Sequence, residues 1–284
     1  MSAQHFSPDD DQWEDPFEID TSVAHPARRY NYWLGGNDNF EADRKSGDAV
    51  AAAFPAIRIT AIENRRFLRR VVTFLVKEAG VRQFLDIGTG IPTAENTHEV
   101  AQSIAPESRV VYVDNDPIVL AHARRLMSST PEGATTYIQA DLRHPGAILS
   151  HPDLGKTIDL SRPVALMLIL VVHFVPEAED PYAHVATLTD ALAPGSYLVM
   201  THATADFWPP EVAAKMDATA KGEDSRSRDP FQFRDKAAFS RFFEGMELIS
   251  PGIQSVPDWR SDLPPEERAS PAEAISYGAV ARIR

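Results

Sequence analysis

From Val81 onward, short apolar runs alternate with segments of helical spacing. The apolar runs predict strands at 82–87, 109–114, 135–139, 163–172 and 196–202. The segments between them predict helices at 93–104, 117–127, about 145–150 and 180–192. The run at 163–172 is apolar on both faces, as expected of a parallel strand that helices cover on each side. This alternation predicts an α/β fold with a doubly wound sheet.

The pattern changes on both sides of this region. Ahead of it, helices are predicted at 41–54 and 60–79, and Gly80 is a natural stop for the second. Behind it, residues 204–233 form a polar stretch with aromatic residues and one expected helix. A helix at 234–243 and strands near 246–250 and 275–283 complete a mostly parallel sheet of seven predicted strands. We therefore expect an N-terminal helical cap over 21–80 and a sheet domain over 81–284 with an insert at 204–233.

Charge and composition narrow the function classes. The chain carries 41 acidic against 28 basic residues, a net charge of −13, which disfavours a broad nucleic-acid surface. It contains no cysteine, which excludes disulfides and thiolate zinc sites in these 284 residues. Residues 1–20 are acidic, unlike a secretory signal, and we expect them to be disordered. The longest apolar run, Val164 to Val172, is too short to span a bilayer. A soluble cytoplasmic protein is the expectation.

The stretch FLDIGTGIPT, residues 84–93, ends the first predicted strand in a glycine turn. Such a turn lets backbone approach NAD, FAD or S-adenosylmethionine. A dinucleotide fingerprint needs a third glycine three residues after Gly90, and Thr93 occupies that position. A phosphate-binding P-loop would require a lysine after the glycines, and none follows. The spacing favours S-adenosylmethionine.

Three predicted strands in succession end in aspartate. Asp86 suits the ammonium group of an amino-acid cofactor, and it would repel a pyrophosphate. Asp114 can accept both ribose hydroxyls, a role that NAD enzymes share. Asp141 can accept the adenine amino group. The alternative is that each aspartate only caps the following helix.

Longer strings carry a resemblance to a known family, among them ARRYNYWLGGNDNFEAD, QFLDIGTGIPTAENTHEVAQ, YVDNDPIVLAHAR and RPVALMLILVVHFVPEAEDP. Over roughly residues 20–260, the chain resembles actinobacterial S-adenosylmethionine-dependent methyltransferases long catalogued as a domain of unknown function. The resemblance implies a Rossmann-like class I methyltransferase fold and no particular substrate. It implies cofactor binding by Asp86, Gly88, Gly90, Asp114 and Asp141. Pro92 stands where the broader methyltransferase pattern has a third glycine.

Methyl transfer often needs a base near the acceptor. His173 follows the fourth predicted strand and His202 ends the fifth, so both are candidate catalytic residues, with structural roles as the alternative. His98, on the helix after the glycine loop, is expected to be structural. The chain lacks the Asn/Asp-Pro-Pro-aromatic motif that amide and exocyclic-amine methyltransferases use at this place, which argues against methylation of nucleic-acid bases. No cluster has convincing metal spacing, so no metal is expected.

The segment RRYNYWLGGNDNF predicts a lid over cofactor and substrate, with Tyr30 and Tyr32 on it and Gly35–Gly36 as its hinge. The alternative is an aromatic flap that packs on the first helix. Arg65 is a candidate for the methionine carboxylate, or else lies on a solvated helix face. The expected cofactor site also includes the neighbouring residues Thr89, Asn115 and Leu142. Phe207, Trp208 and Arg226 are candidates for the substrate wall.

The sequence therefore predicts an S-adenosylmethionine-dependent methyltransferase that acts on a small molecule, with oxygen favoured over nitrogen as acceptor. The alternatives are a cofactor-binding regulatory protein without turnover and an NAD-dependent oxidoreductase. The acceptor and the oligomeric state do not follow from the sequence.

Overall fold

The centre of the molecule is one open sheet. The structure, a computed structural model, describes residues 20–93, 95–119, 129–223 and 231–284. The strands run in the order β3-β2-β1-β4-β5-β8-β6, and β7 pairs with β8 beside this path. Their bounds are β1 Gln83–Ile87, β2 Arg109–Asp114, β3 Ala134–Gln139, β4 Ala165–Ile169, β5 Tyr197–Ala203, β6 Glu247–Leu248, β7 Gln254–Ser255 and β8 Ser276–Arg282.

Strands β1 to β5 pair in parallel, whereas β8 is antiparallel to β5. The predicted doubly wound, mostly parallel α/β sheet is confirmed. The count of seven strands was one too low, because the two-residue strand β7 also pairs with β8 in the described part of the chain. A two-residue strand carries no periodicity that a sequence pattern can reveal.

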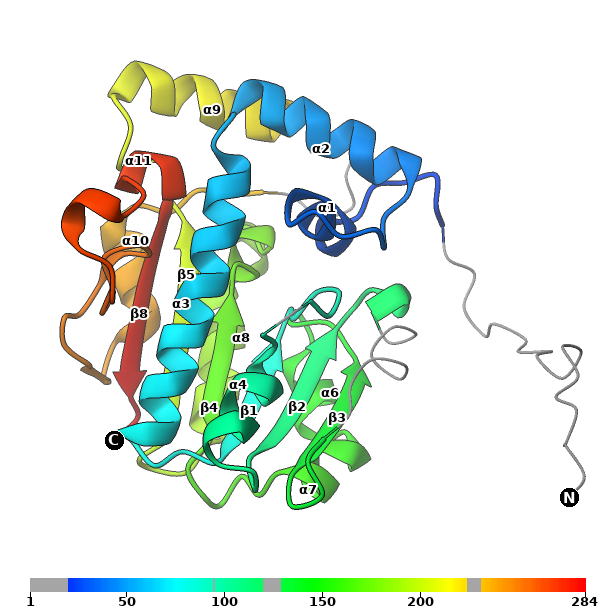
Figure 1. Ribbon diagram of the computed structural model, residues 1–284, viewed down its shortest axis with the longest axis vertical. Helices are drawn as coiled ribbons and strands as arrows, with labels where there is room; N and C mark the ends of the chain where they lie inside the picture. The colour runs from blue at the N-terminus through cyan, green and yellow to red at the C-terminus, as the bar shows by residue number, and fades with distance from the viewer. Residues whose placement is uncertain (1–19, 94, 120–128, 224–230) are drawn as a thin grey trace, which may run out of the picture.

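Helices flank the sheet and cap one end of it (Figure 1). Their bounds are α1 Pro26–Trp33, α2 Glu41–Ala53, α3 Ile57–Lys77, α4 Thr97–Ile104, α6 Pro145–Leu149, α7 Pro152–Thr157, α8 Pro181–Asp190, α9 Pro210–Glu223, α10 Lys236–Ser240 and α11 Pro271–Ala274. Short 3₁₀ turns occupy Val172–Phe174, Glu177–Glu179, Arg241–Phe243 and Pro265–Glu267. None of the helices in the described ranges combines the length and apolar character needed to cross a membrane.

Two hydrophobic layers hold the helices to the sheet. Phe84 and Val110 point to the face that α3 and α4 cover, where Trp259 is fully buried against Phe67. Leu85 and Val111 point to the opposite face, which α6, α7 and α8 cover. Because successive strand residues alternate between faces, a strand apolar at every position fills both layers at once.

Several predicted bounds were wrong for identifiable backbone reasons. The apolar run at 163–172 is a strand only to Ile169, since Leu170 has a φ of 50° and a 3₁₀ turn follows. The helix predicted at 93–104 begins only at Thr97, because Glu95 has a φ of 60°, which no right-handed helix admits. Of the helix predicted at 117–127, residues 120–127 lie outside the described residues, as do residues 1–19 of the predicted acidic tail.

The N-terminal segment is more regular than the lid that the sequence predicts in RRYNYWLGGNDNF. It begins with a regular helix, α1, because Pro26 suits a first helical turn and His25 Nδ1 accepts a hydrogen bond from the Ala27 backbone. Helices α1, α2 and α9 lie together across the end of the sheet toward which β1, β2 and β4 point (Figure 1). This is the end at which open α/β sheets bind ligands.

Candidate functional site

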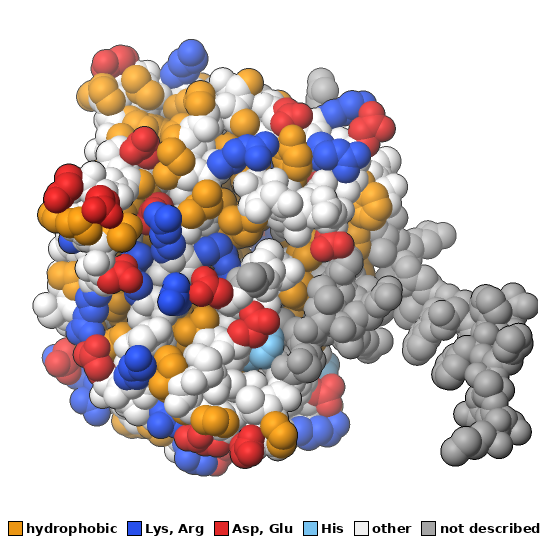
Figure 2. All heavy atoms as spheres, in the orientation of Figure 1, with side chains coloured by type: hydrophobic (Ala, Val, Ile, Leu, Met, Phe, Trp, Pro, Cys, Tyr) orange, Lys and Arg blue, Asp and Glu red, His pale blue; other side chains and the backbone are white. Residues whose placement is uncertain are grey.

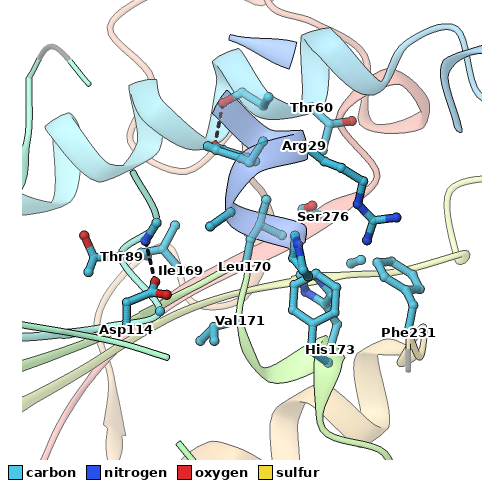
Figure 3. A pocket seen from close by; sticks show the side chains of 18 of the residues that line it. Arg29, Thr60, Thr89, Asp114, Ile169, Leu170, Val171, His173, Phe231 and Ser276 are labelled. Carbon is cyan, nitrogen blue, oxygen red and sulfur yellow. Dashed lines mark hydrogen bonds between the residues drawn. The ribbon is translucent and has the colours of Figure 1, made fainter. Parts of the chain in front are cut away.

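A cavity of about 260 Å³ lies between the carboxyl ends of the parallel strands and the helices above them. Asp86, Asp114 and Asp141, from the ends of three neighbouring strands, all line it. Figure 3 shows Asp114 and Thr89 at one end and His173 and Phe231 at the other. The cavity therefore has an acidic end above β1, β2 and β3 and an aromatic end beyond β4.

The glycine turn after β1 forms part of the acidic end. Gly88 and Gly90 have φ values of 72° and 67°, in the left-handed region that favours glycine. A Cβ atom on Gly88 would lie 2.3 Å from Cγ2 of Val171, so the two segments touch where only glycine fits. Gly88, Thr89 and Gly90 all line the cavity. The turn brings backbone, rather than side chains, to the ligand space.

Asp86 is buried at the tip of β1. Its Oδ2 accepts a 2.6 Å hydrogen bond from the hydroxyl of Thr97, the first residue of α4. Burial raises the pKa of Asp86 to about 6, although the Thr97 hydrogen bond and the Arg65 charge lower it. A positively charged ligand group beside Asp86 would therefore stabilise the ionised form of this buried carboxylate.

Asp114 is fixed by the backbone around it. Its Oδ2 accepts from the Gly90 amide at 2.7 Å and its Oδ1 from the Asp116 amide at 3.0 Å. Burial raises the pKa of Asp114 above its ordinary value. Each carboxylate oxygen has two acceptor positions, so both oxygens can accept further bonds.

Asp141 is held differently, by side chains. Arg143 donates to both of its oxygens, at 2.9 and 2.7 Å, and Asn115 donates to Oδ2 at 3.2 Å. Burial would raise the pKa of Asp141, but Arg143 holds it below the usual value. Asn115 and Leu142 line the cavity beside it. Asp141 is accordingly ionised and fixed in orientation.

Tyr30 and Arg65, both predicted as cofactor contacts, line the cavity. The Tyr30 hydroxyl donates to the Ala61 carbonyl at 2.9 Å, and burial raises its pKa to about 12. An Arg65 Nη2 donates to the Glu95 carbonyl at 2.8 Å.

Other predicted lid residues lie away from the cavity. Gly35 and Gly36 follow the end of α1 and are absent from the cavity wall. A Cβ on Gly36 would lie 2.3 Å from Nδ2 of Asn31, so this glycine makes room for packing under the helix end. Tyr32 points to Asp48 of α2, whose carboxylate accepts from its hydroxyl at 2.7 Å. Gly35 and Gly36 are therefore removed from the candidate cofactor site, because they follow α1 and neither lines the cavity.

His173 lies at the aromatic end, on the 3₁₀ turn after β4. Its side chain is buried, and Nδ1 has no hydrogen-bond partner among the described residues. Burial, His202 and the guanidinium groups of Arg234 and Arg29 hold the pKa of His173 well below its usual value. The ring is therefore neutral near pH 7 and able to accept a hydrogen bond from a ligand.

His202 does not belong to the cavity, which corrects its selection as a catalytic candidate. It is fully buried on β5, where Nε2 lies 2.8 Å from Arg234 Nη1 and Nδ1 lies 2.8 Å from the Ala203 carbonyl. Burial and the Arg234 charge lower its pKa to about 3. Both nitrogens are occupied, so the residue is structural. His98 is also outside the cavity, with Nδ1 2.8 Å from the Tyr112 hydroxyl.

The insert contributes part of the aromatic end. Trp208 lines the cavity, whereas Phe207 packs on Tyr277 of β8, and Arg226 lies outside the described residues. The sequence reading overlooked further lining residues, namely Arg29, Phe54, Phe174, Phe231, Phe233 and Ser276. For Phe231 and Phe233, the sequence does contain an indication: the alternating phenylalanines of PFQF, residues 230–233, follow a long polar stretch.

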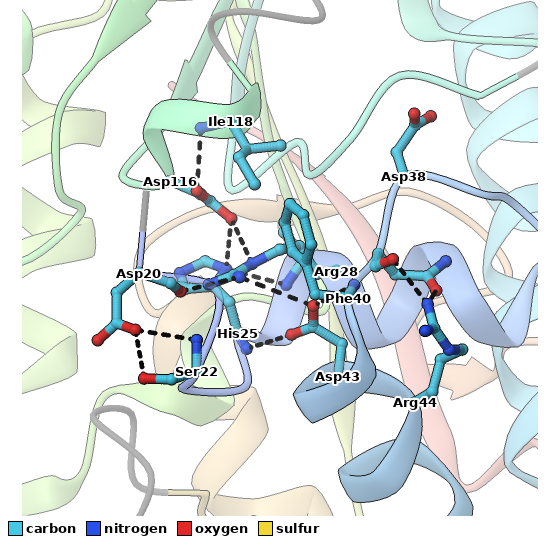
Figure 4. Close-up of polar contacts among 12 residues, drawn as sticks. Asp20, Ser22, His25, Arg28, Asp38, Phe40, Asp43, Arg44, Asp116 and Ile118 are labelled. Atoms are coloured by element: carbon cyan, nitrogen blue, oxygen red, sulfur yellow. Dashed lines mark hydrogen bonds and ion pairs between the residues drawn. The ribbon is translucent and has the colours of Figure 1, made fainter. Parts of the chain in front are cut away.

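Buried ion pairs join the cap to the turn after β2 (Figure 4). Arg28 of α1 lies 3.3 Å from Asp116 through Nε and 3.7 Å from Asp43 of α2 through Nη1. His25 adds a 3.0 Å contact from Nδ1 to Asp116. Asp116 is two residues from Asp114, so the cap is tied directly to the acidic end of the cavity.

Charged side chains elsewhere are spread over the surface. Acidic and basic groups are interspersed on the face drawn in Figure 2. Among the described residues, no group of three or more histidine, aspartate or glutamate side chains is arranged to hold a metal ion.

Known proteins are similar to this chain in sequence and fold. The sequence profile of the S-adenosyl methyltransferases matches residues 12–284. A DUF574 family protein from Streptomyces avermitilis is 47% identical, with a TM-score of 0.88, over 94% of this chain and 100% of that one. A candidate methyltransferase from Thermobifida fusca is 41% identical, with a TM-score of 0.84, over 96% of this chain and 99% of that one.

More distant structures share the fold alone. An O-methyltransferase family protein from Burkholderia thailandensis is 12% identical, with a TM-score of 0.51, over 80% of this chain and 58% of that one. No curated protein matches the chain significantly. The predicted family, class I fold and cofactor are confirmed. The chain belongs to the S-adenosyl methyltransferase family and is an S-adenosylmethionine-dependent methyltransferase.

Proposed function

We propose that the acidic end of the cavity binds S-adenosylmethionine and that the aromatic end holds a small molecule whose oxygen atom receives the methyl group. One observation carries the proposal: Asp86, Asp114 and Asp141 line a single cavity around the Gly88–Gly90 turn. Helix caps alone would not require three aspartates to share one space.

The residues at the acidic end fit this cofactor better than a dinucleotide. Three carboxylates would repel a pyrophosphate, but they suit an ammonium group, a ribose and an adenine amino group. In our assignment Asp86 binds the ammonium group, Asp114 the ribose hydroxyls and Asp141 the adenine amino group. The remaining contacts are assigned to Tyr30, Arg65, Gly88, Thr89, Gly90, Asn115 and Leu142, all of which line the cavity.

One residue at the aromatic end can accept the proton that a hydroxyl group loses when its oxygen is methylated. When bound, the cofactor supplies a methyl group on a positively charged sulfur, which keeps the bonding electron pair when the methyl group leaves. Nδ1 of His173 is assigned to accept the hydroxyl proton, and burial keeps the ring in the neutral form that this role needs. Because the pKa of His173 is low, the ring returns that proton readily to solvent once the product departs.

A small acceptor is supported by the position of the cap. Helices α1, α2 and α9 lie over the strand ends, and Trp33, Phe54 and Trp208 line the cavity beneath them. The space that remains beside the cofactor end is mostly apolar and suits a compact molecule rather than a polymer. No observation favours the alternative of a regulatory protein without turnover.

Calorimetry with S-adenosylhomocysteine tests cofactor binding. The wild-type protein should bind it, and Asp114→Ala should weaken binding by more than about tenfold because two ribose contacts are lost. Asp190→Ala, an exposed aspartate at the end of α8, is the matched control and should change nothing. Equal affinity in the wild type and Asp114→Ala would refute the assignment.

A labelling experiment tests the acceptor atom. Protein, cofactor carrying a deuterated methyl group and a mixture of hydroxyl- and amine-bearing small molecules are incubated, and products are read by mass spectrometry. We expect deuteriomethyl ethers, formed at least about tenfold more slowly by His173→Phe, which retains a ring but has no nitrogen. Labelled amines without labelled ethers would show that nitrogen is the acceptor.

A further inference from the structure

The aromatic end of the cavity is built from a continuous series of ring contacts. Phe174 lies 4.1 Å from His173, His173 4.7 Å from Phe231, and Phe231 4.9 Å from Phe233, measured between ring centroids. Phe233 in turn lies 5.8 Å from Trp208, which is 5.3 Å from Phe54. All six rings line the cavity, and we call them the aromatic wall.

The aromatic wall is assembled from segments far apart in the sequence. His173 and Phe174 follow β4, Phe231 and Phe233 precede α10, Trp208 precedes α9, and Phe54 joins α2 to α3. All five ring contacts in this series are tilted or edge-to-face, with interplanar angles between 52° and 77°. Such an array presents both faces and edges to a ligand, which is how aromatic side chains hold another planar ring.

Two buried polar groups interrupt this apolar lining. Nδ1 of His173 and Oγ of Ser276 each have no hydrogen-bond partner among the described residues, although their side chains are 4% and 0% exposed. Both residues line the cavity, and both are labelled in Figure 3. Leaving such groups unpaired costs about 1–3 kcal/mol each, so a ligand that pairs them gains affinity.

Together these features define a substrate class. We infer that the acceptor is a planar aromatic molecule bearing a hydroxyl group, with its ring against the aromatic wall and its hydroxyl donating to Nδ1 of His173. Ser276 Oγ supplies a second polar contact to the same molecule. The inference rests on the proposed function, because it concerns the acceptor end of the same cavity.

Binding of simple probes tests the inference without turnover. The protein is first saturated with S-adenosylhomocysteine, and dissociation constants are then measured by calorimetry for 2-naphthol, 2-methoxynaphthalene and decahydro-2-naphthol. We expect 2-naphthol to bind about tenfold more tightly than 2-methoxynaphthalene, which cannot donate a hydrogen bond. It should also bind about tenfold more tightly than decahydro-2-naphthol, which has the hydroxyl but no aromatic ring.

Variants assign each preference to its residue. His173→Phe should remove the preference for the hydroxyl and keep the preference for the aromatic ring, and Ser276→Ala should weaken 2-naphthol alone by a few-fold. Phe231→Leu should reduce the preference for the ring. His184→Phe on α8, outside the cavity wall, is the control and should leave both preferences unchanged.

The outcomes are distinguishable. Equal affinities for the three probes, or failure of 2-naphthol to bind, would overturn the inference. A hydroxyl preference that persists in His173→Phe would overturn it too. Failure of the wild-type protein to bind S-adenosylhomocysteine would instead refute the proposed cofactor site. Variants are compared only where S-adenosylhomocysteine binds as it does to wild type, which shows that the cavity is folded.

Discussion

Nη1 of Arg234 lies 2.8 Å from Nε2 of His202, and both side chains are buried. Because a guanidinium only donates, Nε2 is the acceptor and the proton of His202 resides on Nδ1. The same guanidinium donates to the carbonyls of Val172 and Val175, at 3.2 and 2.8 Å. One buried cation therefore fixes the turn that carries His173 against β5.

Arg234→Met should destabilise the protein strongly. The substitution leaves three buried acceptors without their donor, so we expect the free energy of unfolding to fall by about 2–4 kcal/mol. Urea denaturation measures the change. Arg241→Met is the control, since this exposed arginine lies 3.8 Å above the Tyr182 ring and should contribute less than about 1 kcal/mol. Similar small losses in both variants would contradict a central role for Arg234.

Cofactor affinity should depend on the protonation of Asp86. Its pKa is raised to about 6, so the carboxylate is charged above pH 6 and becomes neutral as the pH falls through that value. Affinity for S-adenosylhomocysteine should therefore be highest around neutral pH, where Asp86 is charged and the ligand ammonium group is still protonated, and fall by up to about tenfold per pH unit below about pH 6. Asp86→Asn should bind about tenfold more weakly at neutral pH and lose this dependence. Calorimetry across the range tests both, and an unchanged pH profile in Asp86→Asn would contradict the assignment.

Gly88 should tolerate alanine less well than Gly90 does. Both positions have positive φ, which costs alanine about 1–2 kcal/mol. A Cβ at Gly88 also meets Val171 at 2.3 Å, whereas one at Gly90 meets nothing closer than 3.9 Å. We expect Gly88→Ala to lose a further ~1–3 kcal/mol, measured by chemical denaturation. Adding Val171→Ala should return part of that loss; if it returns none, the contact is not the cause.

The ion pairs of the cap should control how long the cofactor stays bound. Arg28→Gln removes the cation between Asp116 and Asp43, and the dissociation rate of S-adenosylhomocysteine should rise by about tenfold. Stopped-flow tryptophan fluorescence provides the rate. Arg58→Gln, an exposed arginine 5.2 Å from the Tyr32 ring, serves as the matched control. Equal dissociation rates in Arg28→Gln and Arg58→Gln would show that the ion pairs of the cap do not control cofactor release.

Much of the fold could be predicted because its determinants are local. A strand apolar on both faces, such as 165–169, is distinctive wherever helices cover both sides of a sheet. The three aspartates could also be placed together, since parallel strands in succession end at the same edge. Their individual contacts to cofactor groups remain proposals.

The rest depended on geometry that no short pattern contains. His173 follows an apolar strand and His202 ends one, so the sequence pattern treats them alike. In the structure, a backbone reversal at Leu170 brings His173 to the cavity, whereas His202 is buried on β5. The end of β4 was overestimated for the same reason, because residues beyond Ile169 stay apolar after the strand stops. The aromatic wall was largely overlooked because four separate segments meet there, and their pairing is purely tertiary.

The two ends of the cavity are constructed in different ways, and this bears on how such enzymes diversify. At one end, Asp114 is fixed by backbone amides, which few mutations can alter without harming the sheet. At the other, Phe231 and Trp208 come from connecting segments, where replacement is tolerated more readily. Under the proposed assignment of the two ends, lineages that inherit the same sheet can evolve toward new acceptors by exchanging a handful of rings, with their methyl donor left untouched.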